Sequence, residues 1–228
     1  MRLSFVTLFP ELIAPYFEEA ILKRAIAEGR FSVDLRNPRE YTENRYLKVD
    51  DTVTGGGAGM VMSPQPLFDA LTALRSESPG VKILFMTPAA KRFTQNDAKR
   101  LARADHVALV CGRYEGFDER VIETFADEVF SIGDYVLTGG ELPALVIADA
   151  TVRHLPGVLG NHESLQEESF EQGGLEAPAF TKPTVFRNQG TPSVLLGGHH
   201  KNIAHFRREL GLLKTRFFRP DLFRAKRS

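Results

Sequence analysis

Short apolar runs alternate with longer stretches of helical periodicity along the first two thirds of this chain. The runs are rich in β-branched and aromatic side chains, as buried strands are, and they cover residues 2–8, 31–36, 81–86, 106–111 and 127–132. Helical patterns separate them, at residues 10–28, 64–76, 94–104, 118–125 and 141–154. Because strands that alternate with helices form mostly parallel sheets with helices on both faces, the pattern predicts an α/β fold.

Loops rich in glycine or proline follow four of the predicted strands. They span residues 55–59 (GGGAG), 87–89 (TPA), 111–116 (CGRYEG) and 132–141 (IGDYVLTGGE). Glycine lets the backbone approach a ligand closely, and parallel sheets bind ligands at the carboxyl ends of their strands. The alternative is that these glycines serve only to form tight turns. Four such loops together make that alternative less favoured. Neither G-x-G-x-x-G after a strand nor G-x-x-x-x-G-K-[ST] occurs, which argues against a dinucleotide or P-loop site.

The stretch from residue 156 to 198 has no clear periodicity and contains seven glycines and four prolines. A structureless stretch of this length is uncommon inside a compact domain unless it is a linker or a functional loop. We therefore place a domain boundary in it. A helix is expected to begin the next module at residues 201–210.

The formal charge of the chain is zero, but it is unevenly distributed. Residues 201–228 hold nine basic and two acidic side chains, a net charge of +7, and the 20 basic and 27 acidic side chains of the remainder give −7. A solvated basic tail is the simpler reading, but eight large apolar side chains are interleaved with the charges, which is not typical of disorder. The pattern favours a small helical domain with a cationic face for a polyanion.

Cysteine usage and hydropathy exclude several classes of protein. The single cysteine, Cys111, rules out a disulfide framework and a cysteine-based zinc site, and we expect it to be a buried structural thiol. No apolar run approaches 18 residues, so no membrane helix is expected, and the first residues do not read as a signal peptide. A cytoplasmic location follows as an expectation. These features favour an enzyme that acts on a nucleic acid, without naming its reaction.

Three longer motifs resemble one family. They are CGRYEGFDER at residues 111–120, SIGDYVLTGGE at 131–141 and RHLPGVLG at 153–160. Taken together they resemble the bacterial tRNA (guanine-N1)-methyltransferases of the SPOUT class, which methylate guanosine 37 beside the anticodon. The resemblance extends over essentially the whole chain.

The resemblance implies a fold and a domain order. Residues 1–160 would form a mostly parallel α/β domain with a deep trefoil knot that binds S-adenosylmethionine. Residues 161–175 would be a linker, and residues 176–228 a small basic helical domain that binds tRNA. The cofactor site implied by the resemblance consists of Phe85, Thr87, Pro88, Gly112, Glu115, Ile132, Gly133, Tyr135, Leu137, Gly139 and Gly140.

The resemblance also implies a catalytic pair of an arginine and an acidic residue. The arginine falls on Arg153, and the family's aspartate, which precedes Ser-Phe, is replaced here by Glu168, with neighbouring Glu167 as its rival. The carboxylate would take the N1 proton of guanine, and Arg153 would stabilise negative charge on the guanine oxygen. On sequence alone, a solvated acidic loop would be the preferred reading of these glutamates.

The partners implied are a second copy of the chain, in a homodimer with its active site at the interface, and tRNA. Family members also depend on magnesium, for which no ligand cluster is visible in the sequence. The cations expected to grip RNA phosphates are Lys201, Arg207, Arg208, Lys214 and Arg216. Two alternatives remain open: a knotted enzyme that methylates another RNA position, and an RNA-binding module that has lost catalysis.

Overall fold

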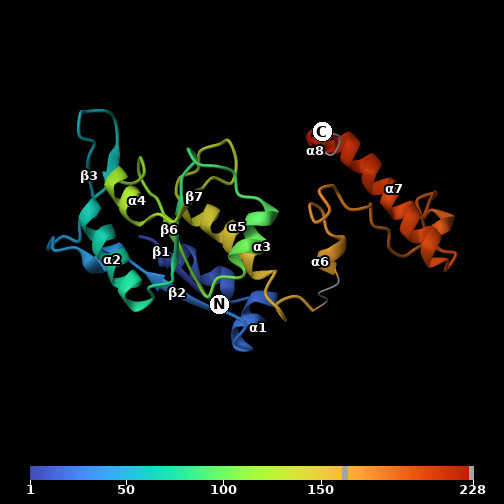
Figure 1. Cartoon of the computed structure of the whole chain (residues 1–228), viewed down its shortest axis with the longest axis horizontal. Helices are drawn as coiled ribbons and strands as arrows, with labels where there is room; N and C mark the ends of the chain where they lie inside the picture. The colour runs from blue at the N-terminus through green and yellow to red at the C-terminus, as the bar shows by residue number, and fades with distance from the viewer. Residues whose placement is uncertain (161–163, 226–228) are drawn as a thin grey trace. The chain divides into compact units, whose positions relative to one another are not determined.

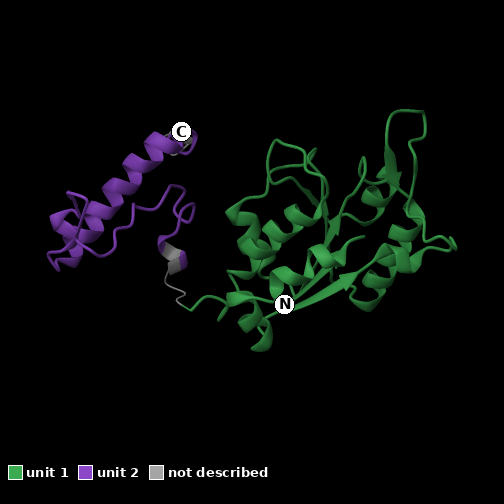
Figure 2. Ribbon diagram, turned by 180° about the vertical axis from the view of Figure 1, so that it is seen from behind, with its two compact units in different colours: residues 1–160 green, residues 161–228 purple. Residues whose placement is uncertain are grey.

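The computed structural model describes residues 1–160 and 164–225. The chain divides into two compact units, Met1–Gly160 and Asn161–Ser228 (Figure 2). The predicted linker, residues 161–175, falls within unit 2, and its first three residues lie outside the described part of the chain.

Unit 1 contains the predicted parallel sheet. Its five strands run in the order β2-β1-β6-β5-β7, and every neighbouring pair is parallel. The strands are β1 (Arg2–Val6), β2 (Ser32–Arg36), β5 (Lys82–Met86), β6 (His106–Cys111) and β7 (Glu128–Phe130). Because all five are parallel, their carboxyl ends meet at one edge of the sheet.

Helices cover both faces of this sheet (Figure 1). Side chains alternate along β5, where Leu84 and Met86 face one hydrophobic cluster while Ile83 and Phe85 face the other. The first cluster includes residues of α1 (Ala20–Ala27), α3 (Gln95–Leu101) and α5 (Glu141–Val152). The second includes residues of α2 (Pro64–Glu77) and α4 (Glu119–Phe125). The predicted α/β class is confirmed.

The long helix predicted over residues 10–28 is wrong. Two 3-10 helices, η1 (Pro10–Leu12) and η2 (Ala14–Phe17), precede the shorter α1. Pro15 lacks an amide proton and cannot donate the hydrogen bond that an α-helix needs at this position. The turns there instead close with hydrogen bonds between residues three apart, such as Tyr16 N–H to Ile13 O at 3.2 Å. The apolar spacing of this segment was compatible with a helix, but the proline was not.

Two short strands lie in a stretch that the sequence suggested was only turns. They are β3 (Asp50–Thr52) and β4 (Met60–Met62), which pair antiparallel after η3 (Pro38–Tyr41). The connection between them uses Gly55, Gly56, Gly57 and Gly59, all with positive φ. Because glycine adopts this backbone conformation without a steric penalty, the glycine run forms the turn of a hairpin.

Unit 2 is dominated by α7 (His200–Phe218), which extends well beyond the helix predicted at residues 201–210. Short elements precede and follow it: α6 (Ser164–Glu167), β8 (Val185–Phe186), β9 (Gln189–Gly190), η4 (Ser193–Leu195) and α8 (Pro220–Ala225). The predicted C-terminal helices are therefore present. Across the described ranges of both units, no helix combines the length and apolarity that crossing a membrane requires.

Candidate active site

A cavity of about 460 Å³ opens among the loops that follow β5, β6 and β7 in unit 1. This is the edge of a parallel sheet where ligands bind, and the volume suits a small molecule, for which sites span roughly 300–1,000 Å³. Ten of the eleven residues predicted for the cofactor line the cavity: Thr87, Pro88, Gly112, Glu115, Ile132, Gly133, Tyr135, Leu137, Gly139 and Gly140. The fold therefore gathers residues that are up to 53 positions apart around one space.

Phe85 is the exception among the predicted residues. Its side chain is fully buried in the sheet, and its ring packs edge-on against Phe117, with the centroids 5.0 Å apart. Phe117 in turn lines the cavity. Phe85 thus supports the wall of the cavity from behind, and its side chain does not line it.

The loops after β5 and β7 are tied together by backbone hydrogen bonds. The Thr87 amide donates to Phe130 O at 3.0 Å, and the Ser131 amide donates to Lys91 O at 2.9 Å. Phe93 N–H donates to Ser131 O at 2.8 Å. The segment from residue 87 to 93 therefore holds the start of the β7 loop on both sides, which fixes the position of the glycines that follow it.

Gly140 occupies the closest approach between two cavity loops. Its amide donates to Gly112 O at 2.8 Å, and a Cβ atom at position 140 would lie 2.6 Å from Gly112 N. No side chain could occupy that distance from rigid backbone, so any other residue would push the loops apart. Here the glycine is required by packing rather than by a positive φ.

An ion pair between a half-buried arginine and a buried glutamate lies beside this contact. Arg113 Nη2 lies 2.9 Å from Glu141 Oε2, and Glu141 is only 2% exposed. Thr7, at the end of β1, donates its hydroxyl to Glu141 Oε1 at 2.8 Å. The Arg113 guanidinium stacks over the Phe9 ring at 4.4 Å. These contacts connect the β6 loop to the first turn of α5 and to the end of β1.

Glu115 places an exposed carboxylate at the cavity. Its amide donates to Met60 O at 2.8 Å, and its side chain lies so close to Gly59 that a Cβ atom there would be 2.6 Å from Glu115 Oε1. The glycine loop of residues 55–59 therefore packs against the β6 loop. A carboxylate in this position can face a positively charged group of a ligand.

Sequence reasoning missed several residues that line the cavity. They are Met86, Ala89, Tyr114, Gly116, Phe117, Glu119, Ile122, Phe130, Ser131, Val136, Thr138 and Pro143. All but Ile122, which lies on α4, are in the loops that had been singled out or close to them in sequence, so adjacency was the signal that could have found them. Thr7 was missed because its partner Glu141 is 134 residues away in sequence.

Cys111 is a buried structural thiol, as expected. Its side chain is fully inaccessible, and burial, together with the nearby Glu141 carboxylate, raises the pKa of the thiol well above its ordinary value. A thiol without thiolate character is a poor nucleophile. In the described ranges of the chain, no group of three or more His, Cys, Asp or Glu side chains could hold a metal ion.

Arg153 and Glu168 belong to different units. Arg153 is the C-terminal cap of α5 in unit 1, where it is half-buried and its amide donates to Asp149 O at 3.2 Å. Glu168 follows α6 in unit 2, where it is also half-buried.

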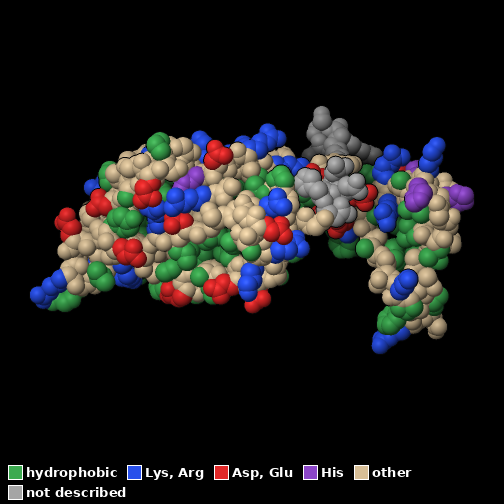
Figure 3. All heavy atoms as spheres, turned by 90° about the horizontal axis from the view of Figure 1, so that it is seen from below, with side chains coloured by type: hydrophobic (Ala, Val, Ile, Leu, Met, Phe, Trp, Pro, Cys, Tyr) green, Lys and Arg blue, Asp and Glu red, His purple; other side chains and the backbone are tan. Residues whose placement is uncertain are grey.

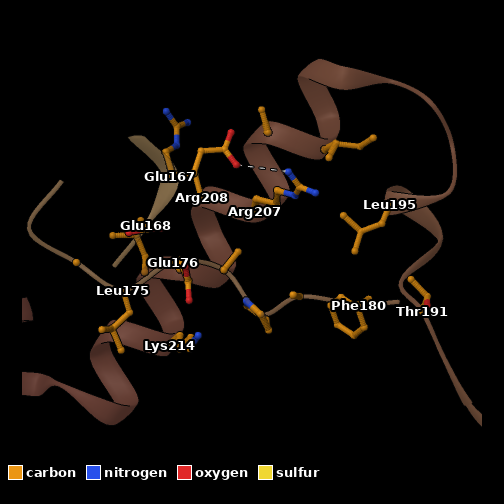
Figure 4. A pocket seen from close by; sticks show the side chains of 18 of the residues that line it. Glu167, Glu168, Leu175, Glu176, Phe180, Thr191, Leu195, Arg207, Arg208 and Lys214 are labelled. Carbon is orange, nitrogen blue, oxygen red and sulfur yellow. Dashed lines mark ion pairs between the residues drawn. The ribbon is translucent and has the colours of Figure 1, made fainter. Parts of the chain in front are cut away.

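A groove of about 1,610 Å³ runs along α7 in unit 2 (Figure 4). Glu167, Glu168 and Glu176 line it from the segment before α7, and Arg207, Arg208 and Lys214 line it from the helix. Glu167 and Arg207 form an ion pair at 3.7 Å in which both side chains are more than half exposed. Such exposed pairs contribute little to stability, so this arginine can exchange its partner for another anion.

The five cations predicted to bind RNA all lie on α7. Lys201, Arg207, Arg208 and Arg216 are exposed, and Lys214 is half-buried. Lys201 and Arg216 do not line the groove. Figure 3 shows cationic and hydrophobic side chains next to one another on the surface of unit 2.

The fold and these two surfaces define a class: an α/β protein with a small-molecule cavity at the carboxyl ends of its strands and a separate unit built on a cationic helix. Residues 1–225 match the family described as tRNA (Guanine-1)-methyltransferase TrmD. The chain belongs to this family.

Similar proteins extend over nearly the whole chain. A tRNA (guanine-N(1)-)-methyltransferase of Sulfurovum sp. (strain NBC37-1) is 54% identical over 226 residues, which cover 99% of this chain and 100% of that protein. The protein of the same name from Sulfurimonas denitrificans is 57% identical, covering 97% and 96%. That of Campylobacter curvus is 53% identical, covering 98% and 94%.

Proposed function

We propose that this protein transfers a methyl group from S-adenosylmethionine to N1 of guanosine 37 in tRNA. Family membership over residues 1–225 carries the reaction class, since the relatives are named for guanine-N1 methylation of tRNA. Its substrate would place the reaction in the cytoplasm.

The unit 1 cavity has the chemistry to hold S-adenosylmethionine. Gly112, Gly133, Gly139 and Gly140 line it, so backbone amides and carbonyls are accessible for hydrogen bonds to an adenine ring. Ile132 and Leu137 offer apolar walls, and Glu115 offers a carboxylate. When bound, the cofactor would supply a methyl group on a positively charged sulfur, and the Glu115 carboxylate is suited to face that charge.

A trefoil knot in unit 1 is part of this proposal. The close crossing of the chain at Gly112 and Gly140, with a hydrogen bond of 2.8 Å, and the enclosure of Ser131 by residues 87–93 support it. Together they bring the loops after β5, β6 and β7 into direct backbone contact.

Guanine N1 carries a proton that must leave as the nitrogen attacks the methyl group. We assign Glu168 as the general base that accepts this proton. Arg153 would stabilise the negative charge that develops on the guanine oxygen. The target guanine must leave its stack in the anticodon loop to reach such groups. The cations of α7 would hold the tRNA backbone through its phosphates.

The proposal also includes a homodimer, which the exposed apolar side chains of α5 support. This helix buries Ala144, Leu145 and Ile147 on one side, yet it also exposes Leu142 (61%) and Val146 (49%). A helix that is apolar all round is normally buried on all sides, so the exposed face is suited to cover a second copy of the chain. The resemblance also implies magnesium, but the described side chains offer no cluster of ligands for it, and we derive no step through it.

One assay tests the reaction. The full-length protein is incubated with S-adenosylmethionine labelled in its methyl group and with unmodified tRNA transcripts that carry G or A at position 37. We expect label on the G37 transcript and none on the A37 transcript. Equal labelling of both would indicate another RNA position, and binding without any label would indicate a non-catalytic module; either result contradicts the proposal.

The base assignment is tested by a matched pair of variants. Glu168→Gln removes the carboxylate with little change in shape, and we expect a fall in kcat on the order of 10²–10⁴-fold, the usual contribution of a general base. Glu167→Gln is the control. Affinity for S-adenosylmethionine, measured by calorimetry, should be unchanged in both. If Glu167→Gln is the inactive variant, Glu167 is the base.

A further inference from the structure

The segment that follows Glu168 is seated on α7 by two small residues of the helix, Gly211 and Thr215. These are the two buried residues of α7, although the helix spans 19 positions. Thr215 is only 2% exposed. A buried polar residue on a largely exposed cationic helix needs a structural or functional reason, because unpaired polar groups are costly to bury.

The hydroxyl of Thr215 joins the helix to this segment. It donates to Gly211 O at 2.7 Å, and it accepts a hydrogen bond from the Leu175 amide at 2.8 Å. Both capacities of the hydroxyl group are thus in use. The second bond connects residues that are 40 positions apart in sequence, so it holds the segment at a defined place on the helix.

Gly211 makes this approach possible. A Cβ atom at position 211 would lie 2.9 Å from Leu175 O and 3.6 Å from Ala177 N, both of them backbone atoms. Real Cβ contacts with backbone do not reach the shorter distance. Any side chain at position 211 would therefore push the segment away from the helix and break the hydrogen bond between Leu175 and Thr215.

The segment between Glu168 and the seat is a closed turn. Phe170, with φ of 75°, donates its amide to Gly174 O at 2.6 Å, and Ser169 Oγ accepts from the Glu176 amide at 3.2 Å. The Phe170 ring also lies beneath the Arg219 guanidinium at 5.7 Å. Glu168 adjoins this turn directly, so its backbone position depends on where the turn is seated.

We propose that Gly211 and Thr215 are positioning residues that fix Glu168 on α7, so that the carboxylate and the cations of the same groove act as one rigid unit on the RNA. Glu168, Arg207, Arg208 and Lys214 all line the groove in which the seat lies. This inference rests on the proposed function, with Glu168 as the general base. It adds that the helix which grips the phosphates also sets the place of the base.

The test compares three variants of the full-length protein. Gly211→Ala displaces the segment while favouring the helical backbone, since alanine is the better helix former. Thr215→Val keeps the shape and removes the hydroxyl, and Thr215→Ser restores the hydroxyl. Gly190→Ala is the control, because a Cβ atom there meets nothing within 4 Å and its φ is not left-handed.

We expect kcat to fall on the order of 10²-fold in Gly211→Ala and Thr215→Val, as misplacement of a catalytic group by about 1 Å can cause. Thr215→Ser and Gly190→Ala should keep the wild-type kcat. The Kd for tRNA and for S-adenosylmethionine should be unchanged in all four variants. Hydrogen exchange at the Leu175 amide should become faster in Thr215→Val and stay slow in Thr215→Ser.

Two results would overturn the positioning role: a wild-type kcat in both Gly211→Ala and Thr215→Val, or a loss confined to tRNA affinity. Failure of the proposed function is distinguishable, because the wild-type protein itself would then transfer no methyl group to the G37 transcript. A loss of helical circular dichroism in Gly211→Ala would also contradict the proposal, since it would mean that the residue supports folding rather than position.

Discussion

A half-buried arginine, Arg113, and a buried glutamate, Glu141, pair next to the unit 1 cavity. Glu141 meets Arg113 at 2.9 Å and Thr7 at 2.8 Å, so its carboxylate is compensated by a cation and a hydroxyl. The desolvation cost of each charge is offset only when its partner is present, because either one alone leaves an uncompensated charge. The pair connects the β6 loop to α5, and both of these elements supply residues to the cavity.

We therefore expect Glu141→Gln to lower the free energy of unfolding of unit 1 by about 3–5 kcal/mol, the usual cost of breaking a buried pair. Denaturant titration, with the unit 1 transition followed separately, measures this. Arg92→Ala is the control, since Arg92 and Asp134 form a pair whose side chains are 66% and 72% exposed. Its cost should be within about 1 kcal/mol. Equal costs for the two variants would contradict the role of burial.

At the scale of the element, α7 has buried residues that contact the rest of unit 2 and cations that line the groove or face solvent. Its buried residues, Gly211 and Thr215, hold the segment that carries Glu168, and its exposed cations face solvent and the groove. A cationic helix surface attracts nucleic acid mainly through phosphates, and this binding releases counterions. Affinity for tRNA should therefore depend on salt through the same side chains.

We expect Arg207→Ala and Arg208→Ala each to weaken tRNA binding and to flatten the plot of log Kd against log salt by about 0.7–0.9 for each lost phosphate contact. Filter binding at several salt concentrations measures both quantities. The control is Arg103→Ala, which removes an exposed cation from unit 1. A slope that stays at the wild-type value in both α7 variants would mean that these arginines do not contact phosphates.

At the scale of the whole molecule, α5 presents the exposed apolar face on which the proposed dimer rests. Leu142 and Val146 are exposed one turn apart. Tyr16 lies on the same side, where its hydroxyl donates to Asp149 at 2.6 Å, and this bond raises the pKa of Tyr16 to about 12. An apolar surface beside a satisfied polar pair is typical of a subunit interface.

We expect the wild-type protein to have twice the 25.4 kDa mass of one chain, and Val146→Glu to dissociate it, because an unpaired carboxylate would be buried in the interface. Light scattering coupled to gel filtration gives both masses. Tyr46→Glu places the same charge on a loop side chain that is 73% exposed, and it should leave the mass unchanged. A monomeric wild-type protein would contradict the dimer.

Much of unit 1 could be predicted from sequence because its signals are local. The apolar runs of β1, β5 and β6 are nearly continuous because both faces of these strands are buried, and the predicted strand positions hold within a few residues. The long helix predicted over residues 10–28 is wrong because its apolar spacing is helical but Pro15 has no amide proton to donate within an α-helix. The strands β3 and β4 are only three residues long, too short for a pattern.

The sequence by itself determined the α/β class, the loops that surround the cavity and the concentration of cations near the C-terminus, since each depends on neighbouring residues. Only the tertiary structure decided that Phe85 stands behind the cavity wall and that Glu141 neutralises Arg113. It also decided that Thr215 holds Leu175. These are contacts between segments distant in sequence, and their partners are fixed by packing geometry, which no local pattern encodes.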